Sequence, residues 1–142
     1  MSVLVPTQEQ ITKLQSLPAD APVAALNLFQ FNAKAQYQPE DPEYGTSEAD
    51  VTGREAYARY GDIAGSSIRD LGGRVVFSTP VDQTLIGPSD PSWDLAAVMY
   101  FPTRKAFMQM LSDPVFESAS RHRKAALANY TMLHLAGAPF SE

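Results

Sequence analysis

The segment Val23–Phe31 limits the possible folds more than any other part of this sequence, because a strand formed there is apolar on both faces. Alternate strand residues point to opposite sides, and both sets are apolar: Val23, Ala25, Phe29 and Phe31 on one, Ala24, Leu26 and Leu28 on the other. A strand with one face in water alternates apolar and polar residues, so this strand requires a cover on each side. The segment 93–101, WDLAAVMYF, predicts a second strand of the same kind.

Helix starts elsewhere in the chain carry N-capping residues. The caps are Thr7 and Thr52, each in a capping box, then Thr103, and Asp113 followed by Pro114. The predicted elements are helices over 6–17, 52–71, 104–111 and 113–128 and strands over 23–31, 74–78, 93–101 and 130–135, with extended structure resuming at 84–87. Residues 32–50 form a long acidic loop whose Tyr37 and Tyr44 either close over a ligand or lie in solvent.

This order predicts an α+β fold of the ferredoxin-like type, β-α-β-β-α-β, with a four-stranded antiparallel sheet and an extra N-terminal helix. We expect an N-terminal helical arm over 1–20 and the main domain over 21–142. Right-handed crossovers place both helix layers on one face of the sheet and leave the other face bare. Because that face is apolar too, the sequence predicts a homodimer packed sheet to sheet, a dimeric α/β barrel. The competing explanation is that the N-terminal helix covers this face.

Composition excludes several classes of partner. The net charge of −5 argues against binding to nucleic acid or to an anionic membrane, since both need basic patches. The chain has no cysteine, so disulfides and cysteine metal sites are ruled out. We expect a cytoplasmic protein, because the first residues lack a signal-peptide pattern and no apolar run approaches the ~20 residues of a membrane span.

The familiar cofactor and catalytic motifs are absent from the sequence. The two histidines are far apart, and no acidic cluster accompanies them at metal-binding spacing. The sequence contains no GxGxxG or Walker A run and no GxSxG nucleophile motif. We therefore expect no metal site and no cofactor.

The candidate site is a set of polar and aromatic residues that the fold could bring together: Asn27, Tyr57, Trp93, Arg104, His122 and Arg123. His122 and Arg123 lie on or beside the apolar stripe of the helix 113–128. Near neutral pH, His122 could act as a general acid or base, and Arg123 could hold a carboxylate or enolate oxygen. The alternative is that both are structural, either hydrogen-bonded or paired with Asp113, Glu117 or Asp94.

Several segments resemble one bacterial family, the longer branch of domain of unknown function 1330, over roughly Ala24 to Leu135. They are LNLFQF (26–31), GREAYARYG (53–61), LGGRVVF (71–77), TLIGP (84–88), WD (93–94), YFPTRKAFMQMLSDPVF (100–116) and HRKAAL (122–127). The resemblance implies the fold of the dimeric α/β-barrel superfamily, whose members include cofactor-free monooxygenases, muconolactone isomerases and dye-type peroxidases. It does not support His122 as a proximal haem ligand.

Two functions follow from these observations. The first is binding or conversion of a small apolar metabolite that carries a carbonyl or carboxylate group, in a pocket between sheet and helices. Conversion there would use cofactor-independent acid–base chemistry of the isomerase or monooxygenase kind, with His122 as the catalytic residue. The second is a non-catalytic dimer that acts through protein interaction, in which His122 and Arg123 are purely structural.

Overall fold

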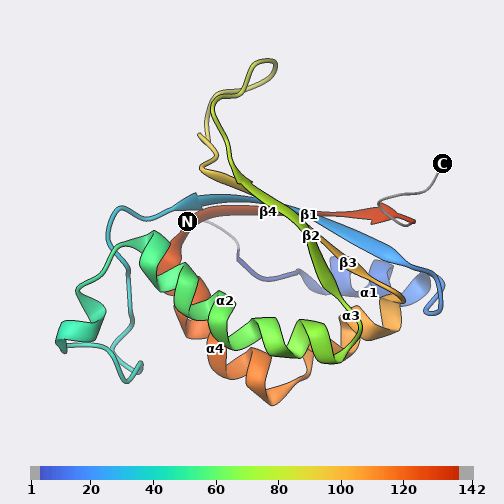
Figure 1. Cartoon of the computed structure of the whole chain (residues 1–142), viewed down its shortest axis with the longest axis horizontal. Helices are drawn as coiled ribbons and strands as arrows, with labels where there is room; N and C mark the ends of the chain where they lie inside the picture. Colours follow the sequence, from blue (N-terminus) through green and yellow to red (C-terminus); the bar gives the residue numbers. More distant parts are fainter. Residues whose placement is uncertain (1–3, 138–142) are drawn as a thin grey trace.

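The computed structural model describes residues 4–137, which form one sheet with helices on one side (Figure 1). The elements are α1 (Gln8–Ser16), β1 (Val23–Phe31), the short 3-10 helix η1 (Ser47–Ala49), α2 (Gly53–Asp70), β2 (Arg74–Pro80), β3 (Leu95–Phe101), α3 (Arg104–Leu111), α4 (Pro114–Ala126) and β4 (Leu127–Ala136). The sheet has the order β2-β3-β1-β4, and each neighbouring pair is antiparallel. The predicted ferredoxin-like α+β fold is confirmed.

The helices begin where the capping residues predicted. The Thr52 hydroxyl accepts from the Glu55 backbone N–H at 3.1 Å, and the Glu55 carboxylate accepts from the Thr52 N–H, also at 3.1 Å. Thr7 and Gln10 make the same reciprocal pair at the start of α1. Asp113 accepts from the Val115 N–H at 2.8 Å and begins α4. Each cap satisfies backbone donors that a helix start leaves unpaired.

The prediction of extended structure at 84–87 was wrong. Residues 81–94 form a loop that rises from the side of the sheet away from the helices (Figure 1), and Leu85 and Ile86 at its tip are 80% and 91% exposed. Gly87 has φ +112°, which no strand residue adopts. A hydrogen bond of 3.0 Å from Val81 N to Asp94 O closes the base of the loop. With no neighbouring strand to pair with, this segment cannot extend the sheet.

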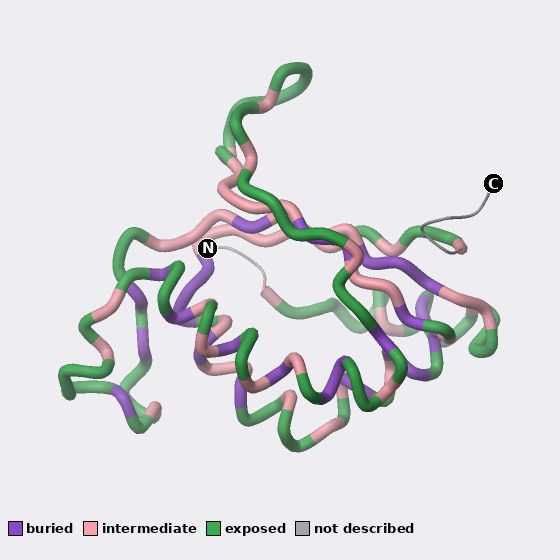
Figure 2. Tube along the Cα trace, in the orientation of Figure 1, coloured by how far each residue is buried: buried purple, intermediate pink, exposed green. Residues whose placement is uncertain are grey.

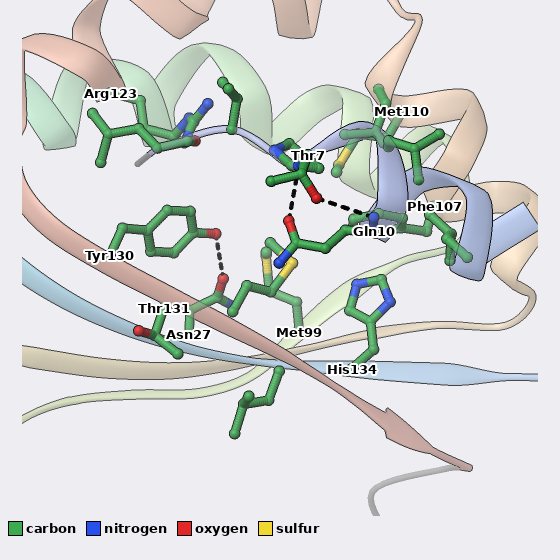
Figure 3. Close-up of a pocket in the computed structure, with 18 of the residues that line it drawn as sticks. Thr7, Gln10, Asn27, Met99, Phe107, Met110, Arg123, Tyr130, Thr131 and His134 are labelled. Carbon is green, nitrogen blue, oxygen red and sulfur yellow. Dashed lines mark hydrogen bonds between the residues drawn. The ribbon is translucent and has the colours of Figure 1, made fainter. Parts of the chain in front are cut away.

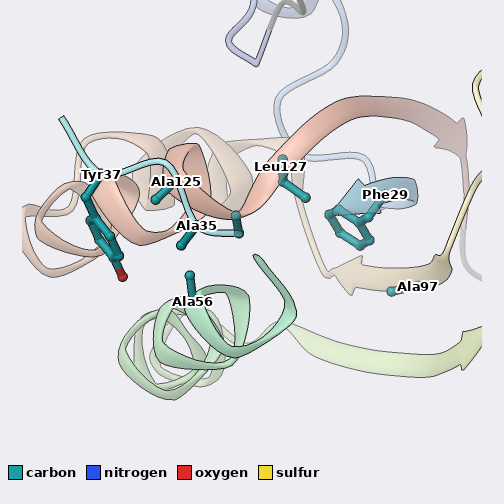
Figure 4. Close-up of a cluster of buried hydrophobic side chains, with 8 residues drawn as sticks. Phe29, Ala35, Tyr37, Ala56, Ala97, Ala125 and Leu127 are labelled. Carbon is teal, nitrogen blue, oxygen red and sulfur yellow. The ribbon is translucent and has the colours of Figure 1, made fainter. Parts of the chain in front are cut away.

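Two buried clusters fill the ends of the space between sheet and helices, as the buried segments in Figure 2 indicate. At one end, small side chains let α2 and α4 approach closely: Ala35 lies between Ala56 of α2 and Ala125 of α4, and Leu127 lies toward Phe29 (Figure 4). At the other end Leu14 of α1 packs with Val23, Phe101 and Met110. The N-terminal helix therefore packs on the helix side of the sheet and does not cover its bare face.

Candidate functional site

A cavity of about 1020 Å³ lies between the inner face of the sheet and the helices, with the N-terminal arm along one side (Figure 3). Its walls are mostly apolar. The lining residues include Asn27 of β1, Met99 of β3, Tyr130, Met132 and His134 of β4, Tyr57 and Tyr60 of α2, Phe107 and Met110 of α3, Phe116 and Arg123 of α4, and Leu4 and Leu14 of the arm. A concave, mostly apolar space with a few polar groups is the usual form of a small-molecule site.

The sheet places one fully buried amide, Asn27, on the floor of this cavity. Its side-chain Nδ2 donates to the carbonyls of Ala25 at 3.1 Å and Ala97 at 3.3 Å, so both amide hydrogens are used. Its Oδ1 accepts from the Tyr130 hydroxyl at 2.6 Å (Figure 3). Asn27 is therefore satisfied by the protein and fixes Tyr130, whose oxygen can still accept a hydrogen bond from a ligand.

Arg123 is the basic group at this end of the cavity. Its Nη1 donates to the Leu4 carbonyl of the arm at 2.8 Å, and its guanidinium carbon lies 5.6 Å from the centre of the Tyr130 ring. Its Nε is buried and has no hydrogen-bond partner among residues 4–137. Within that range the ion pairs join Lys34 to Asp50 and Arg121 to Glu43, and no carboxylate pairs with Arg123. Among residues 4–137 the cation is thus left without an ion-pair partner.

Aromatic rings surround this guanidinium. Phe29 stacks on Tyr130 with ring centres 5.1 Å apart, and Tyr57 lies 4.8 Å from Phe29 and 5.4 Å from Tyr60. Burial raises the pKa of the Tyr60 phenol to about 12 and also raises the pKa values of Tyr57 and Tyr130, although the Arg123 charge opposes each shift. The phenols therefore stay protonated at neutral pH and provide no base.

His134 lies on the same cavity face of β4, farther along the strand. Its ring meets Phe107 edge-on with centres 4.5 Å apart, and its Nε2 is buried without a partner among the described residues. Burial, and secondarily the charge of Arg104, lower the pKa of His134 below 6.5. At pH 7 it is a neutral imidazole, able to donate through one nitrogen and accept through the other.

Three of the six residues proposed from sequence line the cavity, Asn27, Tyr57 and Arg123, while His122, Trp93 and Arg104 do not. Successive helix residues are rotated by about 100°, so Arg123 faces the cavity and His122 points elsewhere. Arg104 is buried and donates to the Pro18 carbonyl at 3.1 Å. Trp93 is partly buried in the segment that precedes β3.

His122 is a contact point for the acidic loop. Its Nδ1 and the Tyr37 hydroxyl lie 2.6 Å apart, and Arg59 donates to the same hydroxyl at 3.0 Å. Beside it Arg121 makes two hydrogen bonds to Glu43, at 2.9 and 3.0 Å. These contacts, rather than the ion pairs considered from sequence, fix the loop against α2 and α4. Tyr37 is buried in them, whereas Tyr44 is exposed.

We expect the protein to lose stability when the pH falls from 7.5 to 5.5. Burial, followed by the Arg121 charge, lowers the pKa of His122 below 6.5, and His134 is shifted in the same direction. The unfolded chain then binds protons more readily, so the stability present above pH 6.5 declines below it. Glu43 and Asp113, whose pKa values are also lowered, titrate below about 4.5 and stay charged across this window.

Urea unfolding at the two pH values measures this effect. A His122→Gln, His134→Gln double variant should show a smaller change, since neither replacement titrates. Equal or greater wild-type stability at the lower pH would contradict the assignment of both histidines as neutral groups in the folded chain.

Sequence reasoning missed Tyr130 and His134. The segment YTMLHL was identified as the last strand, and strand alternation places Tyr130, Met132 and His134 on one face. This two-residue alternation was the sequence signal that could have identified Tyr130 and His134 as neighbours on one face. What it could not supply was the register, which pairs Asn27 with Met132 and so sets Tyr130 and His134 beside the inner face of β1.

Residues 42–138 match the model of a family described as Domain of unknown function (DUF1330). The chain belongs to the DUF1330 family. The match begins after β1, although the sequence resemblance was drawn from Ala24 onward. No curated protein matches the sequence.

Solved structures extend the likeness over the whole chain. RPA0582, a protein of unknown function from Rhodopseudomonas palustris, is 32% identical with a TM-score of 0.84, covering 97% of this chain and 98% of its own. Its methylated form is 30% identical with a TM-score of 0.85, covering 99% and 98%. A mutant form of SnoaB, a cofactor-independent oxygenase from Streptomyces nogalater, is 15% identical with a TM-score of 0.50, covering 85% and 96%. That last similarity concerns the fold alone.

Within residues 4–137 no group of three or more histidine, aspartate or glutamate side chains is placed to hold a metal ion. No helix in the described part of this DUF1330 chain has both the length and the apolarity needed to cross a bilayer.

Proposed function

We propose that this DUF1330 protein binds a small apolar carboxylate in the cavity, with the carboxylate held by Arg123. The observation that supports this is a cation at an apolar, aromatic site whose Nε has no partner and which no described carboxylate neutralises. A charge removed from water without a counterion is costly, and a ligand carboxylate would offset that cost. A guanidinium edge also matches the planar geometry of a carboxylate.

The other groups around Arg123 favour the same ligand class. Tyr130 uses its proton on Asn27, so its oxygen is an acceptor suited to a ligand hydroxyl or to the protonated form of an acid. Methionine and aromatic side chains line much of the remaining wall, which suits a hydrocarbon or aromatic body. A carbonyl oxygen or an enolate could occupy the same position, but a full negative charge compensates Arg123 best.

Calorimetry with matched ligands tests this proposal. Decanoate and phenylbutyrate are expected to bind wild type, and their primary amides, which have the same shape without the charge, are expected to bind much more weakly. Arg123→Met should reduce carboxylate affinity by about 10- to 100-fold, the value of hydrogen bonds to a charged group. Lys124→Met removes one positive charge from an exposed position of the same helix and should change nothing.

If acids and amides bind wild type equally, or if Lys124→Met weakens binding as much as Arg123→Met, the assignment of Arg123 is wrong. The alternative in which Arg123 is purely structural gains support if no carboxylate binds at all. His122→Ala separates the two histidines: it should lower the melting temperature, because Tyr37 loses one of its two hydrogen-bond partners, and leave ligand affinity unchanged.

We also propose that two copies of the chain pack through the face of the sheet that lacks helices. On that face Phe77, Leu133 and Leu135 are 48%, 50% and 42% exposed. The register places Leu26 and Leu28 of β1 opposite Val98 and Ala96 of β3 on the same side. Leaving such a surface in water costs about 25 cal/mol per Å². The apolar tip of the loop 81–94 projects on this side and is placed to touch a partner (Figure 1).

A further inference from the structure

We infer that the cavity takes an elongated ligand with two polar ends: a carboxylate at Arg123 and an uncharged hydroxyl or carbonyl group at His134. This inference rests on the proposed function and specifies the ligand further. His134 is its new element, because the fold brings this histidine to the cavity and no contact within the described chain uses its Nε2.

Buried polar atoms without hydrogen-bond partners support the two polar ends of this ligand. Among residues 4–137, the buried side-chain atoms without a hydrogen-bond partner are Arg104 Nε, Arg123 Nε and His134 Nε2. Two of these three belong to residues that line one cavity. A buried polar atom left unpaired is costly, so it marks a place where a bound group would make a bond. Figure 3 shows Arg123 and His134 on opposite sides of the cavity, with the Asn27–Tyr130 pair, the Thr7–Gln10 pair and Met99 between them.

The spacing along β4 sets the length of the ligand. Tyr130 and His134 share a face and are separated by four residues, which at ~3.3 Å per residue places their Cα atoms ~13 Å apart. The Arg123 guanidinium lies against the Tyr130 ring, so the two polar ends are separated by about the same strand length. A medium-chain or arylalkyl acid spans this distance, and a short acid such as hexanoate does not.

The methionines on the wall between the two ends favour a mainly apolar body for the ligand. Met132 projects between Tyr130 and His134 on β4, and Met99 and Met110 line the same space from β3 and α3. Methionine side chains adapt to straight or branched hydrocarbon and to ring edges. The polar side chains between the two ends already hydrogen-bond within the protein, Thr7 with Gln10 and Tyr130 with Asn27. We therefore place the two hydrogen-bonding groups of the ligand at its ends.

The neutral protonation state of His134 favours an uncharged group at this end of the ligand. Its ring packs edge-on against Phe107, and the buried cation Arg104 lies close enough to disfavour a proton on the imidazole. Arg104 does not line the cavity, so a second carboxylate at His134 would contact a neutral imidazole and no cation. A hydroxyl can pair with either nitrogen of that imidazole, and a carbonyl with the protonated one. The ligand class is therefore an ω-hydroxy or ω-keto acid rather than a dicarboxylate.

The test compares decanoate, ω-hydroxydecanoate and sebacate, the matching dicarboxylate, by calorimetry. We expect wild type to bind the hydroxy acid at least as tightly as decanoate and sebacate more weakly than either. His134→Phe preserves the ring and its contact with Phe107 but removes both nitrogens. The His134→Phe variant should reduce the affinity for the hydroxy acid by about tenfold relative to the affinity for decanoate, because the terminal hydroxyl loses its partner. Met132→Leu, on the same face, should affect both monoacids equally.

Thermal unfolding of His134→Phe confirms that any loss is not a folding defect, and unchanged decanoate binding serves as a second check. The inference is overturned if His134→Phe reduces the affinities for decanoate and ω-hydroxydecanoate equally. It is also overturned if wild type binds ω-hydroxydecanoate more weakly than decanoate, or if it binds sebacate most tightly. In those cases decanoate binding that depends on Arg123 would still support the proposed function. Failure of every acid to bind wild type would overturn the proposed function itself.

Discussion

Replacing Gly53 by alanine is expected to destabilise this protein by about 3 kcal/mol or more, the upper part of the range for overpacking. Gly53 is the first residue of α2, and its N–H donates to the Asn32 carbonyl at 3.1 Å. An added Cβ would lie 2.6 Å from the Ala126 carbonyl oxygen and 2.9 Å from the Asn32 nitrogen, and closer still to the Asn32 oxygen. These are backbone atoms, so no side-chain rotation relieves the clash.

The effect is large because three elements meet at this point: the start of α2, the end of β1 and the end of α4. The same junction holds Tyr57 one turn into α2 and Arg123 one turn before the end of α4. Thermal unfolding should show a melting temperature lower by ~10 °C, at about 3 °C per kcal/mol for a chain of this size. Binding of acids should weaken as well, because both side chains line the cavity.

Gly61 provides the matched control. It lies in the same helix, and an added Cβ would meet nothing within 4 Å. Gly61→Ala should stabilise the protein by about 0.5–1 kcal/mol, because alanine is the better helix former and restricts the unfolded chain. If Gly53→Ala melts within a degree or two of wild type, then the close approach of α2 to β1 and α4 is wrong.

Placing a lysine on the bare face of the sheet is expected to convert a dimer into a monomer. Wild type should behave in light scattering as a species of twice 15.5 kDa at micromolar concentration. Leu133 is half exposed in the single chain, so Leu133→Lys can fold. In a symmetric dimer the substitution occurs twice. Each copy removes about 1.5–3 kcal/mol of stabilisation from apolar burial, and the two lysine charges are left buried without partners.

Val115→Lys is the control for this experiment. Val115 is 46% exposed, close to Leu133 in exposure, but it lies on α4 and therefore on the helix side. That variant should keep the wild-type mass. A wild-type mass of 15.5 kDa, or a dimer that survives Leu133→Lys and Phe77→Lys together, would contradict association through this face.

Local rules were sufficient for most of the fold. Helix starts depend on contacts within a few residues, as at the capping pairs of Thr7 and Thr52 and at Asp113–Pro114. The strand at 23–31 follows from the two-residue alternation of its side chains. Each of these elements forms where it was expected. The failure at 84–87 has a different origin. Thr84, Leu85 and Ile86 have strand-like composition, but a strand forms only beside a partner, and the sheet provides none there.

The site was harder to predict because it depends on rotation and register. His122 and Arg123 are adjacent in sequence, yet the helix turns one toward the acidic loop and the other toward the cavity. His134 lies in the predicted strand 130–135 with no motif around it, and only the pairing of β4 with β1 places it opposite Ala25 on the inner face of the sheet. That no carboxylate among residues 4–137 forms an ion pair with Arg123 is a property of the folded chain. With 16 acidic residues in the sequence, composition alone gives no sign of it.

The Arg123 Nε–H group itself provides the most direct measurement. Its signal in the NMR spectrum of isotope-labelled protein is identified as the arginine resonance that disappears in Arg123→Met. Addition of decanoate is expected to shift this resonance in proportion to occupancy, as a new hydrogen bond to a carboxylate forms, while decanamide leaves it in place. A signal that stays unmoved while decanoate binds would contradict the central claim that this arginine holds the ligand.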